Sequence, residues 1–361
     1  MSESVQSIER LQVLRTDIEK WLQAYVVALP TTLGVGVSQN GELALERLKD
    51  FALRPGKRIR GALAIIGYEM FGGTHRRTGL DLAVAVELAQ DYLLIIDDVM
   101  DRSAQRRGGD AVHYEYQRML QRDYGTRDYA HLGNMLGVNV GLIAQHLSAR
   151  LVGDIAEPPE RIVRALHIFQ TNITATGFGQ LDDLMNEAGQ ALDLEGTRHM
   201  YMLKSSYYTF INPLQLGAVL AGAADTQLGP IERFGQAAGM AFQLQDDIIG
   251  MFGDTRTTGK SALDDLREGK MTLLMRHALA RTDDVQRAVI EAALGNADVT
   301  PTQHREVQEI LDALGSRAYI SQEARKAADA AREILVTQTA WSPEAKTFLQ
   351  DLLTYIIRRE R

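Results

Sequence analysis

The chain has 361 residues, of which 45% are hydrophobic and 24% charged, with a formal net charge of −8 and no cysteine. The missing cysteines exclude disulfides, thiolate zinc sites and iron–sulfur clusters, and they fit a reducing cytosol, so we expect a cytoplasmic protein. The acidic balance argues against a nucleic-acid partner. No apolar run approaches the ~18 residues of a membrane span, so we expect no transmembrane segment.

The first cationic segment in chain order is RPGKRIRG at 54–61. It places Lys57, Arg58 and Arg60 beside a glycine at an expected helix start, where free backbone N–H groups also favour anions. Each base taken alone is more simply a solvated surface group. Together they predict a binding site for an anionic group such as a phosphate.

The next segment, LLIIDDVMD at 93–101, predicts a buried helix that ends in three carboxylates. Asp97 and Asp101 stand at i and i+4, so a helix puts them on one face, where two like charges destabilise it by about 0.2–0.5 kcal/mol. A hard divalent cation removes this repulsion, and all-oxygen ligation on a rigid backbone suits Mg²⁺. A polar loop at 102–111 follows and carries the adjacent Arg106 and Arg107.

Two interpretations of these acids stay open at this point. The three carboxylates of 97–101 either bind a metal ion or form an ion-pair network with Arg102, Arg106 or another base. A second pair, Asp246 and Asp247, favours the metal, because it also lies in an apolar helical stretch, where unpaired charge is costly.

Helical patterns fill the rest of the chain. Small-residue apolar stretches at 216–224 and 234–242 indicate helices that are buried on most sides. TPTQ at 300–303 combines an N-cap threonine, a first-turn proline and a capping-box glutamine, and SPE at 342–344 begins the last helix in the same way. No linker divides the chain, so we expect an all-α fold and a single large helical domain over residues 1–361.

In chain order, these motifs resemble those of the trans-isoprenyl diphosphate (polyprenyl) synthases over about residues 45–280. The matching elements are GKRIRG (56–61), DDVMD (97–101) with RRG (106–108), KS (204–205) and a second aspartate region that begins FQLQDD (242–247). Four motifs in order are a specific signal, whereas a lone DDxxD is not, because class I terpene cyclases carry one too. Within the family, the chain is most similar to bacterial geranylgeranyl diphosphate synthases.

The resemblance implies a helical bundle or barrel of the isoprenoid synthase type around a central cavity, and a homodimer. The two aspartate motifs would face each other across that cavity. Asp97 and Asp101 would ligate Mg²⁺ from one wall and Asp246 from the other, with three ions in each active site. Asp98 and Asp247 would act through water or hydrogen bonds.

The resemblance also implies the substrates, isopentenyl diphosphate and an allylic diphosphate (dimethylallyl, geranyl or farnesyl). The residues that would contact the diphosphates share cationic or amide side chains: Lys57, Arg60 and Arg107 for isopentenyl diphosphate, Arg106, Lys204 and Lys260 for the allylic diphosphate, with Gln90 and Lys270 beside them. Ser205 and Gln243, near Lys204, would present dipoles to a developing allylic cation. Catalysis would be electrostatic, without a side-chain nucleophile.

The second aspartate motif departs from the family pattern. It reads DDIIG, so Gly250 stands where many members have a third aspartate. We expect activity to survive, because the first aspartate of that motif, here Asp246, does most of the ligation in the family. Asp254 either replaces the missing acid or is a loop residue. Asp183, in GQLDD, either orients a neighbour at the site or is a surface acid.

Helix positions before the first motif predict the product length. At a rise of about 1.5 Å per residue, Tyr92 lies about 7–8 Å before Asp97 and Ala89 about 12 Å before it. Leu93, one turn away, shares the face of Asp97. In the family an aromatic at the position of Tyr92 fits C15 or C20 products, and a plain core aromatic there is compatible with either.

Bacterial farnesyl diphosphate synthases often have two extra residues inside the first motif, and DDVMD has none. We therefore expect a synthase of geranylgeranyl diphosphate (C20), with farnesyl diphosphate (C15) as the alternative product. A class I terpene cyclase and a silent partner subunit of a heteromeric synthase are further alternatives. The intact first motif and the basic clusters argue against the silent subunit. A second Asp-Asp pair, in place of the usual second motif of cyclases, argues against the cyclase.

Overall fold

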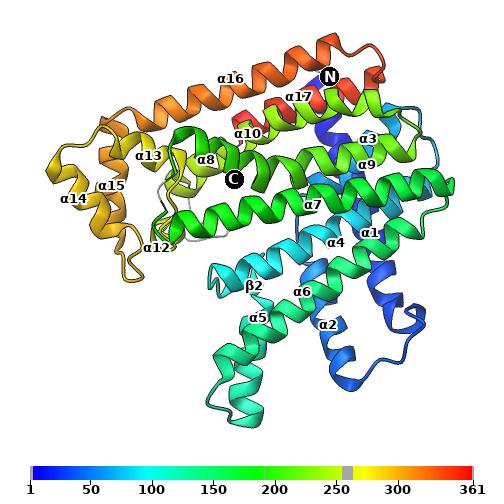
Figure 1. The fold of residues 1–361 in the computed structure, drawn as a ribbon, viewed down its shortest axis with the longest axis horizontal. Coiled ribbons are helices and arrows are strands. Elements are labelled where there is room, and N and C mark those ends of the chain that lie inside the picture. Colours follow the sequence, from blue (N-terminus) through cyan, green and yellow to red (C-terminus); the bar gives the residue numbers. More distant parts are fainter. Residues whose placement is uncertain (1–2, 191, 254–262, 360–361) are drawn as a thin grey trace. The chain divides into compact units, whose positions relative to one another are not determined.

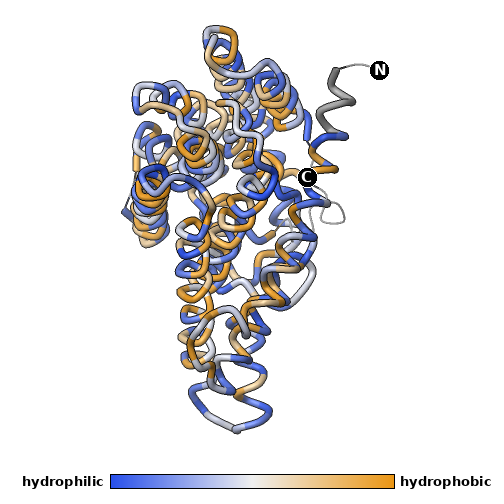
Figure 2. Tube along the Cα trace, turned by 90° about the vertical axis from the view of Figure 1, so that its right-hand side faces the viewer, coloured by the Kyte–Doolittle hydropathy of each residue, from blue (hydrophilic) through white to orange (hydrophobic). Residues whose placement is uncertain are grey.

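The computed structural model describes residues 3–190, 192–253 and 263–359, and nearly all of its regular structure is helical (Figure 1). The strands described are two residue pairs that form one antiparallel hairpin. The expected all-α fold is confirmed. Hydrophobic and hydrophilic residues alternate along most helices, as amphipathic helices around a core require (Figure 2). No helix among the described residues is long and apolar enough to cross a membrane.

The chain groups into two compact units. Unit 1 comprises Met1–Phe169 and Pro213–Ala223, and unit 2 comprises Gln170–Asn212 and Ala224–Arg361. The division falls within helix α7 (Pro159–Glu187) and at the start of helix α9 (Asn212–Leu220). The single domain expected over residues 1–361 stays a prediction beside this division.

Unit 1 is built around α4, which packs against α3 and α6, and α6 packs in turn against α5. In chain order, the elements of unit 1 up to α6 are α1 (Glu3–Thr32), α2 (Gln39–Leu53), α3 (Ile59–Met70), α4 (Arg76–Met100), β1 (Gln105–Arg106), β2 (Gly109–Asp110), α5 (Val112–Met119), the π-helix η1 (Leu120–Tyr124) and α6 (Tyr129–Gly153). The middle of α4 is almost continuously buried, so packing within unit 1 fixes the position of its C-terminal turn.

Helix α9 belongs to unit 1, and its close packing against α3 depends on two glycines. A Cβ on Gly67 of α3 would lie 2.5 Å from the carbonyl oxygen of Leu214, and one on Gly217 of α9 would lie 2.3 Å from the backbone nitrogen of Tyr68. Neither position can hold a side chain unless the helices separate. The two backbones therefore pack closer together than any other residue type would allow at these points.

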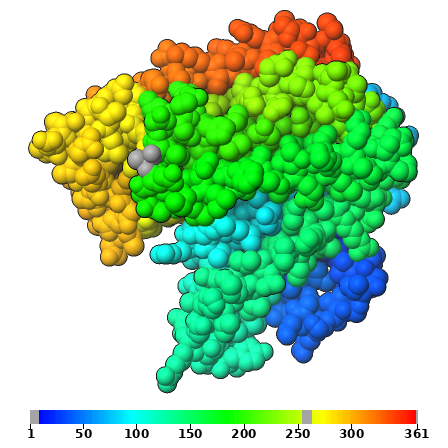
Figure 3. All heavy atoms as spheres, in the orientation of Figure 1, coloured from blue at the N-terminus to red at the C-terminus, as the bar shows by residue number. Residues whose placement is uncertain are grey.

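Unit 2 is built around α10 (Leu228–Phe252), which packs against the π-helix η2 (Met202–Ile211) and against α16 (Ser316–Thr337). Its remaining elements are α8 (Leu194–Tyr201), the 3₁₀-helix η3 (Asp225–Gln227), α12 (Asp264–Arg267), α13 (Leu273–Leu279), α14 (Asp284–Ala293), α15 (Pro301–Ala313) and α17 (Pro343–Arg358). The space-filling view shows α14 and α15, in yellow to orange, packed side by side (Figure 3).

Both helix starts predicted near the C-terminus are confirmed. The Thr300 hydroxyl caps α15 by accepting a hydrogen bond from the backbone nitrogen of Gln303 at 3.3 Å. The Gln303 side chain in turn accepts one from the backbone nitrogen of Thr300 at 2.9 Å. Ser342 caps α17 by accepting from the backbone nitrogen of Ala345. Each cap satisfies backbone N–H groups that the first helical turn leaves unpaired.

Candidate active site

The cationic segment at 54–61 lies at the start of α3, as expected. Arg58 is the N-cap, with a left-handed backbone (φ 52°), and its buried guanidinium pairs with Glu87 at 3.2 Å. Arg58 also donates to the carbonyl oxygen of Ala52 at 2.7 Å. This arginine therefore fixes the turn. Lys57 is exposed and Arg60 half-buried, so these two remain the bases that a diphosphate could reach.

The first aspartate motif occupies the C-terminal end of α4, with Asp101 as its C-cap. Asp98 is fully buried and Asp97 half-buried. Arg106 forms ion pairs with both, at 3.3 Å to Asp97 and closer to Asp98. Burial lowers the pKa of Arg106, but the carboxylates of Asp98 and Asp97 outweigh it and raise the pKa overall. The ion-pair network that the sequence left open is therefore present at this motif.

The loop at 102–111 contains regular structure that its polar sequence did not predict. β1 and β2 pair within it, with Arg106 opposite Gly109. The turn between them holds Arg107 at φ 51° and Gly108 at φ 77°. Arg107 points back to α4 and donates to the buried carboxylate of Asp91 at 3.1 Å. We call residues 102–111 the arginine loop.

Asp91 is a partner of Arg107 that the sequence analysis missed. Its side chain is completely buried, and its Oδ2 has no hydrogen-bond partner among the described residues. Burial raises the pKa of Asp91 to about 6, although the guanidinium of Arg107 lowers it. The only sequence signal was an acid in an otherwise apolar part of a helix, directly after Gln90.

The predicted chain-length residues lie on α4 before the first motif. Ala89 is buried, and Tyr92 and Leu93 are half-buried, as is Gln90. Burial raises the pKa of the Tyr92 phenol. The tunnel that these side chains would line stays a prediction.

In unit 2, Lys204 and Ser205 lie on the π-helix η2, which the sequence did not predict. Lys204 pairs with Asp183 of α7 at 2.5 Å. The hydroxyl of Ser205 donates to Gln243 Oε1 at 2.6 Å, and Gln243 Nε2 donates to Asp247 Oδ1 at 2.9 Å. The pairing with Lys204 is the contact that the orienting interpretation of Asp183 requires.

Asp247 ends this hydrogen-bonded chain inside unit 2. Its second oxygen accepts from the hydroxyl of Tyr201, which in turn accepts from the backbone nitrogen of Leu273 at 3.1 Å. Burial raises the pKa of Asp247 to about 8, and the hydrogen bonds from Tyr201 and Gln243 lower it less than burial raises it. Both oxygens of Asp247 therefore accept hydrogen bonds, while its predicted role at the metal site stays a prediction.

Asp246, the neighbouring acid of the second motif, is 43% exposed and pairs with Arg359. Arg359 is buried: it donates to the carbonyl oxygen of Phe242 at 2.9 Å, and its guanidinium lies 3.9 Å from the centre of the Phe242 ring. The sequence analysis missed this partner, because nothing in the terminal basic residues indicated which carboxylate they would meet.

Gly250, where many family members have a third aspartate, faces another carboxylate. A Cβ at Gly250 would lie 2.0 Å from Asp265 Oδ2, so Asp265 fills the space that a side chain would need. Asp254 and Lys260 lie outside the described residues. Lys270 pairs with Glu268 at 2.5 Å.

The carboxylates of the two motifs fit Mg²⁺. Within residues 3–190, 192–253 and 263–359, no group of three or more His, Asp or Glu side chains could hold a metal ion by itself. Mg²⁺ does not need such a group, since it is usually held by one or two carboxylates, substrate phosphates and several waters. Asp97 in unit 1 and Asp246 in unit 2 are accessible oxygen donors on regular helices, as this kind of ligation requires.

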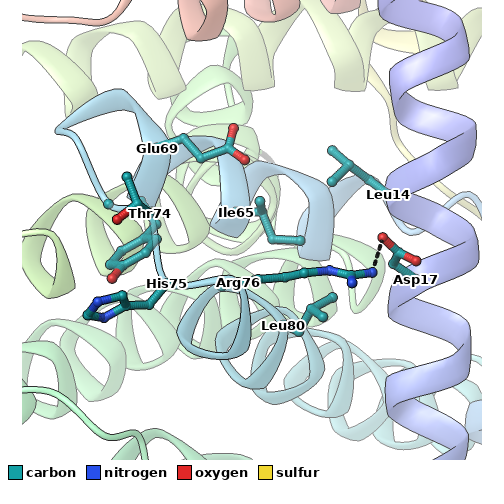
Figure 4. Close-up of a pocket in the computed structure, with 11 residues that line it drawn as sticks. Leu14, Asp17, Ile65, Glu69, Thr74, His75, Arg76 and Leu80 are labelled. Carbon is teal, nitrogen blue, oxygen red and sulfur yellow. Dashed lines mark ion pairs between the residues drawn. The ribbon is translucent and has the colours of Figure 1, made fainter.

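A pocket elsewhere in unit 1 contains none of the predicted site residues. It has a volume of about 470 Å³ and lies between α1, α3 and the start of α4 (Figure 4). Arg76 extends along it to an ion pair with Asp17 at 2.8 Å. Arg76 is paired with Asp17, and the lining also includes the acid Glu69, so the pocket offers no net positive charge to a phosphate.

Two curated proteins are similar to this chain over most of its length. A geranylfarnesyl diphosphate synthase of Aeropyrum pernix is 29% identical over 308 residues, 84% of this chain and 90% of that protein. A geranylgeranyl diphosphate synthase of Saccharolobus solfataricus is 28% identical over 307 residues, 85% of this chain and 87% of that protein.

A solved structure is also similar. It is a geranylgeranyl pyrophosphate synthase of Corynebacterium glutamicum complexed with isoprenyl diphosphate and magnesium, with a TM-score of 0.86, 27% identity and coverage of 97% of this chain and 98% of that one. The polyprenyl synthetase family description matches residues 42–314, which include both aspartate motifs and both arginine clusters. The chain belongs to the polyprenyl synthetase family.

Proposed function

We propose that this protein condenses isopentenyl diphosphate with an allylic diphosphate to give a short-chain trans-prenyl diphosphate, geranylgeranyl diphosphate (C20). The observation that carries the proposal is the first aspartate motif at the end of α4, with the arginine loop folded back onto it, in a chain of this family. The names of the relatives support a short-chain product, and farnesyl diphosphate (C15) is the alternative.

The cofactor we propose is Mg²⁺, three ions in each active site. Asp97 and Asp101 would hold it from α4 and Asp246 from α10. When bound, Mg²⁺ neutralises the diphosphate and so makes it a better leaving group. The magnesium in the Corynebacterium glutamicum complex supports this choice.

The protein's own contribution is to bind, orient and keep water out. Arg106, Lys204 and Lys260 hold the allylic diphosphate, and Lys57, Arg60 and Arg107 hold isopentenyl diphosphate. The allylic C–O bond breaks, the double bond of isopentenyl diphosphate attacks the resulting cation, and a proton leaves to the departing diphosphate. The dipoles of Ser205 and Gln243 stabilise the allylic cation. The reaction passes through this cation and needs no side-chain nucleophile.

We also propose that the protein is a homodimer. Helix α7 exposes Phe178, Leu181 and Met185, each more than half exposed, at the i, i+3, i+7 spacing of one helical face. Large apolar side chains gathered on one face favour a protein partner, and a second copy is the commonest one. The cytoplasmic location stays a prediction.

Incubation of the purified protein with Mg²⁺, isopentenyl diphosphate and each allylic primer in turn tests the function. We expect elongation to C20, read by chromatography of the dephosphorylated products. Products that form from one prenyl diphosphate alone, without isopentenyl diphosphate, would identify a cyclase. No turnover with any primer would support the silent subunit and contradict the proposal.

A further inference from the structure

Arg54, at the C-cap of α2, holds both strands of the hairpin in the arginine loop. Its side chain is only 10% exposed. The Nη1 atom donates to the carbonyl oxygen of Arg106 at 3.1 Å and to that of Asp110 at 2.8 Å. Arg106 belongs to β1 and Asp110 to β2, so one nitrogen joins the two strands.

The other side of the same guanidinium is fixed to two helices. Nη2 donates to Asp50 of α2 at 2.7 Å and to Glu115 of α5 at 2.9 Å. The second oxygen of Glu115 pairs with Arg47 of α2, also at 2.9 Å. Because all of these partners are charged or are backbone carbonyls, the planar fork of an arginine is held in one orientation.

Gly109 of β2 is in close contact with this guanidinium. A Cβ at Gly109 would lie 2.7 Å from Arg54 Cζ and 2.9 Å from its Nη1. The loop backbone therefore lies directly against the guanidinium, at a distance that leaves no room for a side chain. The close approach of Gly109 to Arg54 is separate evidence, beside the hydrogen bonds, that the loop backbone contacts the Arg54 side chain.

The clamped turn carries both predicted diphosphate-binding arginines. The left-handed backbone of Arg107 is uncommon for a residue other than glycine, and such a conformation persists where its surroundings over-determine it. The guanidinium groups of Arg54 and Arg107 also share the Phe51 ring, with Cζ atoms 5.4 and 5.7 Å from its centre. A shift of Arg54 would therefore move the backbone of Arg106 and the support of Arg107 together.

We propose that Arg54 is a positioning residue that sets where the arginine loop presents Arg106 and Arg107 to the two diphosphates. The assignment of those two arginines to diphosphates rests on the proposed function. No assigned role in binding or metal ligation falls on Arg54 itself. It acts through the loop backbone, so its loss changes substrate affinity before it changes the chemical step.

The test compares wild type with Arg54→Lys, Gly109→Ala and the double variant. Lysine keeps the charge but cannot bond two carbonyls and two carboxylates from one plane, and the alanine methyl pushes the guanidinium aside without removing it. We expect KM for both diphosphates to rise about tenfold in each single variant, the loss of about one charge-assisted hydrogen bond, with kcat within about threefold. The double variant should be less than additive, because both changes break one contact.

Hydrogen exchange provides a readout that does not depend on turnover. Amides of residues 103–111 should exchange faster in Arg54→Lys, while peptides of α6 exchange as in wild type. Arg47→Gln is the matched control: it removes the other arginine on Glu115, and Arg47 has no hydrogen bond or ion pair to a described loop residue, so the change should leave both KM values unchanged.

Three results would overturn the proposal: unchanged loop exchange in Arg54→Lys, faster exchange with unchanged KM values, or an equal rise of KM in Arg47→Gln. If wild type elongates no primer, the proposed function fails separately. The affinity for inorganic diphosphate, measured by calorimetry, then replaces KM. An affinity equal in wild type and Arg54→Lys would overturn the role of Arg54 in diphosphate binding, and weaker binding in the variant would support it.

Discussion

Asp97 and Asp246 are the two acids to which the proposed function assigns the metal most directly. Asp97→Ala and Asp246→Ala should each lower kcat/KM by about 10³-fold or more, because several kcal/mol of charge stabilisation in the transition state are lost. The circular dichroism spectrum should not change. Thermal stabilisation by Mg²⁺ with inorganic diphosphate should weaken in both variants.

Asp312→Ala, at an exposed acid of α15, is the control for these variants and should behave as wild type. Near-wild-type kcat in either aspartate variant at saturating Mg²⁺ would contradict the assignment of metal ligands.

Asp91 should make stability depend on pH in an unusual direction. Its folded pKa of about 6 lies above the ordinary value of 3.8, so its contribution to stability is complete below pH 3.8 and is lost as pH rises through 6. Relative to Asp91→Asn, wild type should lose about 2 kcal/mol of unfolding free energy between pH 4 and pH 7. Urea unfolding at several pH values measures this difference.

Asp154→Asn, at an exposed acid of unit 1, is the control for Asp91 and should show no comparable trend. A difference between wild type and Asp91→Asn that stays constant with pH would contradict the raised pKa.

The Gly250 position should reject the aspartate that many relatives have there. Gly250→Asp places a second carboxylate against Asp265, so we expect a loss of about 1–3 kcal/mol in unfolding free energy. Adding Asp265→Ala should recover much of that loss, since the space is then open. Urea unfolding of the single and double variants tests this, and a fully stable Gly250→Asp would show that Asp265 does not fill the space.

Residue types and their context were sufficient to predict the acids and bases of the motifs, but not their partners. The pairs Arg107–Asp91 and Arg359–Asp246 join residues 16 and 113 positions apart, and only the packed fold brings them together. Arg54 lay inside a segment singled out for its charge, yet its hydrogen bonds to the arginine loop go to backbone carbonyls, which leave no mark on the sequence.

At the scale of elements, α4 should control product length. Tyr92→Ala should lengthen the product, because removing a half-buried ring opens space that costs about 3–5 kcal/mol if it stays empty and that a longer tail can fill. Ala89→Phe should shorten it. Product analysis of both variants at equal conversion is the measurement.

Ala89 is buried in unit 1, so the folded state of Ala89→Phe is checked first by thermal unfolding. Wild-type chain length from both folded variants would place the limit of the tunnel on another helix.

Helices with regular caps and periodic apolar faces were predictable, because their signals are local. The π-helix η2 was not: its wider turn follows no 3.6-residue period, and it holds Lys204 and Ser205 where they meet α7 and α10. The hairpin of the arginine loop was missed for a related reason, since two-residue strands are too short to show alternation.

At the scale of the whole molecule, the proposed dimer predicts a mass of about twice 40.0 kDa in solution. Phe178→Glu with Leu181→Glu should give monomers, because two charges would replace exposed apolar contacts on α7. Val285→Glu, at a more exposed apolar residue of α14, should leave the mass unchanged. Light scattering after size exclusion measures all three proteins, and a dimeric double variant would place the interface elsewhere.

The interrupted sequence of unit 1 has a consequence for how the protein is made. Residues 170–212, 43 in all, leave the ribosome before the segment Pro213–Ala223 that completes unit 1. At about 5–20 residues per second, the nascent unit waits about 2–9 s with the face around Gly67 uncovered. The surface of α3 that α9 covers in the folded protein is open to chaperones during this interval.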